Sequence, residues 1–69
     1  MDMTKKIRMA ESYAGISEAE LARRVGTSSQ AFGQRVKTGK FTSEELEDIA
    51  KALGAEYKSF FEFPDGQKV

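Results

Sequence analysis

Residues 16–32 read ISEAELARRVGTSSQAF and contain two helix starts with one helix stop between them. Ser17 begins the first helix as part of a capping box, because its hydroxyl can accept the backbone N–H of Glu20, whose carboxylate can reach back to Ser17. Gly26 ends this helix, since glycine tolerates the positive φ of a helix C-terminus. Thr27-Ser28-Ser29 offers the N-cap of a second helix. The pattern therefore predicts two short helices separated by a tight, glycine-containing turn.

Further helices are predicted on both sides of this unit. Before it, residues 4–14 place apolar side chains on one helical face, and Gly15 ends that helix. After it, the second helix ends near Gly39, and Thr42-Ser43-Glu44-Glu45 is a capping box that opens a helix closed by Gly54. The residues expected to form the core are apolar positions on these helices and one C-terminal aromatic residue: Leu21, Val25, Phe32, Val36, Leu46, Ile49, Leu53 and Phe60.

The C-terminal residues are rich in aromatic side chains. Tyr57, Phe60 and Phe61 predict one or two more helical turns. Phe63-Pro64-Asp65-Gly66 is a turn signature, after which residues 67–69 can either pair back as a short β-hairpin or add to a strand of a partner.

With 69 residues and a mass of 7.7 kDa, the chain has room for one small domain. The fold class that follows is all-α, with four to five helices in one compact domain over residues 1–69. The helical core is expected at about residues 4–61, and residues 62–69 form a tail or hairpin.

The composition excludes several classes of function. Without Cys or His, the chain has no disulfide, thiol nucleophile, zinc finger or His-centred triad. It also lacks a Ser-x-x-Lys pair and a glycine-rich phosphate loop, so we expect no enzyme activity, catalytic residue, metal, cofactor or small-molecule ligand. No apolar run approaches the ~18–20 residues that span a bilayer, and no signal-peptide core is present. A cytoplasmic protein without a membrane partner is expected.

The charge is balanced overall but unevenly distributed. Eleven basic and eleven acidic residues give a net charge of zero. Residues 1–40 carry eight basic and four acidic residues, a net +4, whereas residues 41–69 carry three and seven, a net −4. The basic half can face a nucleic acid.

These features resemble the lambda-repressor and Cro-like helix-turn-helix family, also called the XRE family, from about residue 7 to residue 61. The resemblance is carried by Gly15-Ile16-Ser17, Glu20-Leu21-Ala22, Val25-Gly26-Thr27-Ser28 and Ile49-Ala50-Lys51-Ala52-Leu53-Gly54. It implies a compact domain that binds double-stranded DNA sequence-specifically and regulates transcription, with repression as the expected outcome. Members of the family commonly bind palindromic operators as dimers.

The chain departs from the family pattern at three places. Glu18 stands where the family usually has a glutamine that grips a phosphate. Glu11 and Arg35 stand where the family has an arginine and a glutamate, so they form either a reversed ion pair or two separately solvated charges. Gly33 lies inside the second helix of the unit, where glycine costs roughly 0.5–1 kcal/mol relative to alanine, and either permits close approach or is merely tolerated.

The resemblance makes the helix at residues 28–37 the reader of the major groove. Gln30 and Gln34 lie one turn apart on a face opposite Phe32 and Val36. The expected base contacts are Ser28, Ser29, Gln30 and Gln34. The expected phosphate contacts are Ser17, Thr27, Arg35, Lys37, Thr38 and Lys40.

The expected partners are double-stranded DNA and a second copy of the chain. A homodimer is predicted through Phe61, Phe63 and Val69. The alternative is a frayed tail with Phe61 and Phe63 folded onto their own domain. A rival function also stays open: a protein-interaction module of the same fold that has lost most DNA affinity. Zero net charge and Glu18 favour this rival.

Overall fold

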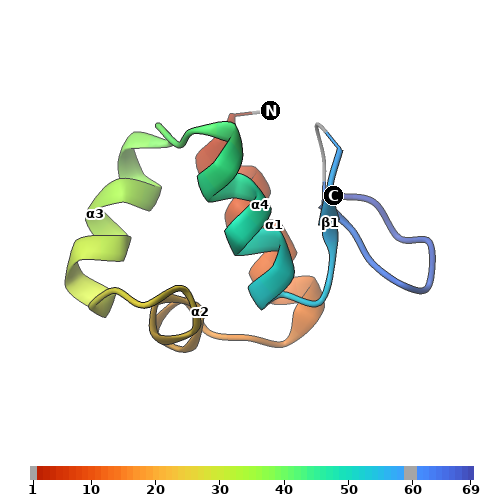
Figure 1. Cartoon of the computed structure of the whole chain (residues 1–69), viewed down its shortest axis with the longest axis horizontal. Coiled ribbons are helices and arrows are strands. Elements are labelled where there is room, and N and C mark those ends of the chain that lie inside the picture. The colour runs from red at the N-terminus through yellow and green to blue at the C-terminus, as the bar shows by residue number, and fades with distance from the viewer. Residues whose placement is uncertain (1, 59–60) are drawn as a thin grey trace.

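The computed structural model describes residues 2–58 and 61–69, which form four helices followed by a short antiparallel sheet (Figure 1). The elements are α1 (Met3–Ala14), α2 (Glu18–Val25), α3 (Ser29–Thr38), α4 (Ser43–Ala52), β1 (Glu56–Tyr57) and β2 (Phe61–Glu62). The molecule measures 31 × 21 × 19 Å along its principal axes. The expectation of a small, mostly helical protein is confirmed.

Each helix begins at a polar residue whose side chain accepts a backbone N–H from the first turn. These N-caps are Asp2, Ser17, Ser28 and Thr42. The predicted capping box at Thr42 is complete, since Glu45 N–H donates to Thr42 Oγ1 at 3.1 Å and Thr42 N–H donates to Glu45 Oε1 at 2.8 Å. At Ser17 only half of the predicted box forms, because the Glu20 carboxylate binds the two arginines in the last turn of α2 instead.

The turn between α2 and α3 spans only residues 26–28. Gly26 adopts a φ of 86°, and the N–H of Thr27 donates to the carbonyl of Ala22 at 3.0 Å, which closes α2. In Figure 1, α3 stands at the left edge and α2 lies beneath it, seen almost end-on, so the two helices cross steeply. α4 lies between α3 and β1 in the same view.

One hydrophobic core joins all four helices and the C-terminal segment. Its buried members are Ile7, Ala10, Leu21, Ala22, Phe32, Val36, Leu46, Ile49, Ala50, Leu53, Phe61 and Phe63. Six of the eight predicted core residues are among them. Val25 is only partly buried at the edge of the core, and Phe60 lies outside the described residues.

The helical turns predicted around Tyr57 and Phe61 are wrong, because both residues lie in the short sheet. Gly54, with a φ of 74°, turns the chain away from the axis of α4. Tyr57 and Phe61 then face each other across β1 and β2, with ring centroids 5.7 Å apart in an edge-to-face contact. Aromatic residues favour strands, and directly opposed aromatic pairs stabilise them.

The predicted return of the chain after residues 63–66 is confirmed. Gly66 N–H donates to the carbonyl of Phe63 at 2.9 Å. Phe61 and Val69 exchange two backbone hydrogen bonds of 2.8 Å, so the last residues add a third extended segment beside β2.

Candidate nucleic-acid interface

The outer face of α3 carries polar and basic side chains. Phe32 and Val36 are buried, whereas Gln30, Gln34 and Lys37 are exposed. At 100° per residue, these three exposed positions lie together on the side of the helix opposite the buried pair. α3 contains no acidic residue.

The first turn of α3 carries the two serines expected to contact bases. The Ser28 hydroxyl oxygen accepts the N–H of Ala31 at 3.1 Å, which leaves its own proton available for donation. Ser29 is exposed but lies one turn before Gly33, on the flank of the helix rather than on the face of Gln30 and Gln34. All four residues expected at the bases are solvent-exposed.

The residues expected at phosphates have different surroundings. Lys37 and Lys40 are exposed near the end of α3, and Thr27 is exposed in the turn before it. The Ser17 hydroxyl caps α2 by accepting the Glu20 N–H at 3.1 Å. The Thr38 hydroxyl donates to the carbonyl of Arg35 at 2.8 Å and accepts from the N–H of Lys40 at 3.2 Å, so it stabilises the end of α3.

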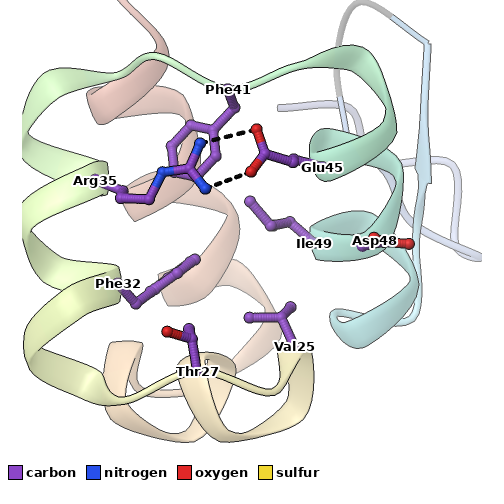
Figure 2. Close-up of a pocket in the computed structure, with 8 residues that line it drawn as sticks. All are labelled: Val25, Thr27, Phe32, Arg35, Phe41, Glu45, Asp48 and Ile49. Atoms are coloured by element: carbon purple, nitrogen blue, oxygen red, sulfur yellow. Dashed lines mark hydrogen bonds and ion pairs between the residues drawn. The ribbon is translucent and has the colours of Figure 1, made fainter.

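Arg35 is engaged within the protein rather than free to bind phosphate. Its guanidinium forms a two-pronged ion pair with Glu45 of α4, one arm being Nη2 to Oε1 at 2.8 Å (Figure 2). It also donates to the carbonyl of Lys40 at 3.2 Å and lies 4.9 Å from the ring centroid of Phe41. These bonds from Arg35, with the Thr42 N–H, lower the pKa of Glu45 to about 2. The guanidinium therefore ties α3 to α4.

A small cavity of about 170 Å³ lies below this ion pair, between α3 and α4. Figure 2 shows Phe32 reaching into it from α3 and Ile49 from α4, with Val25 and Thr27 at its lower end, whereas the Asp48 carboxylate points away. Pockets for small-molecule ligands usually have about 300–1,000 Å³. This cavity is therefore smaller than usual ligand pockets, and its lining does not indicate a particular ligand.

The reversed ion pair between Glu11 and Arg35 does not form, and Glu11 is not a solvated charge either. Glu11 is only 7% exposed, on the inner face of α1. Arg35 lies on the flank of α3 that faces α4, so it meets Glu45. Burial, and secondarily the charge of Glu18, raises the pKa of Glu11 to about 7, while Arg8 acts in the opposite direction.

Sequence reasoning missed two long-range contacts that join helices far apart in the chain. Thr4 Oγ1 in α1 donates to the carbonyl of Val36, near the end of α3. Arg24 at the end of α2 donates to the carbonyl of Ala52, the last residue of α4. The residues next to Thr4 and Arg24 in the sequence do not indicate which distant backbone carbonyl each side chain will bind.

The residues expected at a dimer interface are largely internal. Phe61 is 0% and Phe63 is 6% exposed, because both pack into the core of their own chain. Tyr13 lies against Phe63 with ring centroids 4.6 Å apart, and its hydroxyl donates to Asp65. Val69 is partly buried on the same core. The placement of a dimer contact on the two phenylalanines is therefore corrected, whereas dimerisation itself stays a prediction.

Comparison of the chain with models of protein families, with curated proteins and with solved structures gave no match. Within residues 2–58 and 61–69, no helix has both the length and the apolar character needed to cross a bilayer. The same part of the chain holds no group of three or more acidic, His or Cys side chains arranged for a metal ion.

Proposed function

We propose that the protein binds double-stranded DNA sequence-specifically and regulates transcription, with α2 and α3 acting as a helix-turn-helix of the lambda-repressor and Cro type. The observation that carries the proposal is the outer face of α3. It presents Gln30, Gln34 and Lys37 to solvent without an acidic residue, opposite a buried Phe32 and Val36. An α-helix with such a face has the size and chemistry to enter the major groove.

The way α3 is held supports this role. A helix that reads bases must be fixed to within a fraction of an ångström by the residues behind it. Arg35 and Glu45 fix its side toward α4, and Thr4 binds the carbonyl of Val36 in its last turn. These contacts leave the outward side chains free.

The exposed residues divide by chemistry into base and phosphate contacts. A glutamine amide can bind the N6 and N7 atoms of adenine through two hydrogen bonds, which suits Gln30 and Gln34. Lys37 and Lys40 lie where the chain leaves the groove and fit phosphates, which fix register but carry no sequence information. Binding of an operator in the path of RNA polymerase then gives repression.

The proposal is tested by fluorescence anisotropy with random duplex DNA at about 50–200 mM salt. The logarithm of the association constant should fall linearly with the logarithm of the salt concentration, with a slope of about −0.9 per neutralised phosphate. In the double variant Lys37→Ala, Lys40→Ala, which loses two expected phosphate contacts, the slope should be less steep by about 1–2. Lys51→Ala, an exposed lysine on α4, is the matched control and should leave it unchanged.

One observation favours the rival function, a protein-interaction module. The Glu18 carboxylate lies in the first turn of α2, with Oε2 3.5 Å from the position that a Cβ on Gly33 would take, so negative charge flanks α3. Absence of DNA binding at about 50 mM salt, in a chain that melts cooperatively, would decide for this rival.

A further inference from the structure

In the part of the chain that the structure describes, one buried carboxyl group lacks a full set of partners. Glu11 lies on the buried side of α1 with Ile7 and Ala10, and it is 7% exposed. Its Oε2 atom has no hydrogen-bond partner among the residues that the structure describes. A buried ionised carboxylate in that position is costly, whereas the protonated acid is not charged and can also donate a hydrogen bond.

A second carboxylate makes ionisation of Glu11 still less favourable. Glu18, at the start of α2, acts on Glu11 as a like charge, and the opposing cation is Arg8 of α1. Arg8 is bound to Glu18, with 3.9 Å between Nε and Oε1, and is half-exposed, so it compensates only in part. On the α3 side the neighbour of Glu18 is Gly33. The two carboxylates therefore lie where α1, α2 and α3 meet.

We infer that Glu11 is a proton-binding site through which DNA binding is coupled to proton uptake. The inference rests on the proposed function, in which phosphates lie close to Ser17 and to α3. Those phosphates bring further negative charge to the junction that holds Glu18 and Glu11. Since negative charge nearby favours the protonated acid, DNA should bind more tightly to the protein in which Glu11 carries a proton.

The relevant pH range is near neutrality. Burial and Glu18 raise the pKa of Glu11 to about 7, so its charge changes between pH 6 and pH 8. The chain has no His or Cys that would titrate in the same range. The α-amino group, with a usual pKa of about 8, is present in every variant and cancels in their comparison.

The experiment measures the affinity for one duplex at pH 6, 7 and 8 at fixed ionic strength, for the unmodified protein, Glu11→Gln and Glu47→Gln. If the bound phosphates raise the pKa of Glu11 by about one further unit, the unmodified protein binds about fivefold more tightly at pH 6 than at pH 8. Glu11→Gln, which mimics the protonated acid, should bind tightly at both pH values with less than about twofold change. Glu47→Gln removes an equal charge from the exposed face of α4 and should keep the full pH dependence.

A second measurement needs no variant. Carbon NMR of the Glu11 carboxyl should give a titration midpoint that moves upward by about one pH unit when DNA is added. DNA binding with an affinity that does not change with pH, or an equal pH dependence in Glu11→Gln, overturns the coupling but leaves the proposed function standing. Failure of all three proteins to bind at any pH overturns the proposed function and the coupling with it.

Discussion

Under the proposed function, Gln30 and Gln34 are the side chains of α3 that should distinguish one base pair from another. Both are exposed, one turn apart, and make no contribution to the buried face of the helix. Replacing either with alanine should therefore relax sequence preference at one or two base pairs by about 1–3 kcal/mol. The measurement is selection of bound sequences from a random pool, together with a melting curve that should shift little.

The matched control for this prediction is Gln67→Ala, an exposed glutamine in the C-terminal segment. It should leave sequence preference unchanged. An unaltered preference in both Gln30→Ala and Gln34→Ala would mean that another surface reads the DNA.

Gly33 and Gly39 illustrate how backbone conformation decides the effect of adding one methyl group. Gly33 is helical, and a Cβ there would lie 3.5 Å from the flexible Glu18 carboxylate, an ordinary contact. Gly33→Ala should therefore raise the free energy of unfolding by about 0.5–1 kcal/mol. Gly39 has a φ of 67°, and a Cβ would approach Thr4 Oγ1 to 3.1 Å. Gly39→Ala should be destabilising, and urea unfolding of both variants checks the opposite signs.

Glu11 gives the stability of the free protein a definite pH dependence. Its pKa is raised from 4.5 to about 7 on folding, so the folded state holds a proton that the unfolded state has lost. Stability is unaffected below about pH 4.5, falls as pH rises toward about 7, and then levels off. Between pH 4.5 and pH 8 this decline amounts to about 3 kcal/mol, because one pKa unit corresponds to about 1.4 kcal/mol, and Glu11→Gln should remove it.

The pH dependence, rather than the stability at one pH, is the diagnostic quantity, since a buried amide has its own desolvation cost. Urea unfolding at pH 4.5, 6 and 8 measures the pH dependence of the free energy of unfolding directly. Glu47→Gln should leave the pH profile unchanged. A profile for Glu11→Gln that parallels the unmodified protein would place Glu11 in solvent.

At the level of helices and strands, local signals in the sequence were sufficient for the helices. Capping residues and terminal glycines act within one turn, so the starts at Ser17, Ser28 and Thr42 could be predicted without knowledge of the fold. The sheet could not, because Tyr57 and Phe61 are four apart, a spacing that suits a helix as well as a hairpin. The sheet forms because β1 packs against α4 and because Phe61 and Phe63 form backbone hydrogen bonds with residues 67–69.

For the candidate site, exposure could be predicted and pairing could not. The outward placement of Gln30 and Gln34 follows from helical periodicity alone. The partner of Arg35 depends on how α3 and α4 are oriented, which no local pattern states. The sequence was therefore sufficient to predict which side chains of α3 are exposed, but not which contacts fix α3 to the other helices.

The capping box of α4 should contribute measurably to the stability of the protein. Thr42 accepts the N–H of Glu45, and Glu45 in turn accepts the N–H of Thr42 and binds Arg35. Thr42→Ala should lower the free energy of unfolding by about 1 kcal/mol. Ser43→Ala, at the next and exposed position, is the control and should change it little. Equal effects of the two substitutions in urea unfolding would contradict the cap.

On the scale of the whole molecule, the basic and acidic halves of the sequence belong to different elements of the fold. Residues 1–40, with a net charge of +4, form α1 to α3, whereas the net −4 of residues 41–69 lies on α4 and the sheet. Figure 1 places α3 and the sheet at opposite ends of the long axis. Under the proposed function, a charge distribution of this kind would orient the molecule with α3 toward the DNA while the net charge stays zero.

The C-terminal segment is the other whole-molecule feature, because it closes the core from the end opposite α3. Val69 exchanges two hydrogen bonds with Phe61, and the N–H of Phe63 donates to the carbonyl of Gln67 at 2.8 Å. Deleting residues 67–69 removes these bonds and uncovers buried aromatic surface. The free energy of unfolding should fall by about 2–4 kcal/mol, from lost hydrogen bonds of about 1 kcal/mol each and the apolar contact of Val69.

Protein concentration separates this role within one chain from a role in a dimer. Because all the bonds lie within one chain, the loss of stability should be the same at about 5 and 100 µM, whereas a dimer contact would make the melting temperature depend on concentration. Gln67→Ala keeps the backbone bonds and should melt close to the unmodified protein. Light scattering on the full chain and the truncated chain completes the test. A truncated chain that is equally stable but smaller in mass would assign the segment to a dimer interface instead.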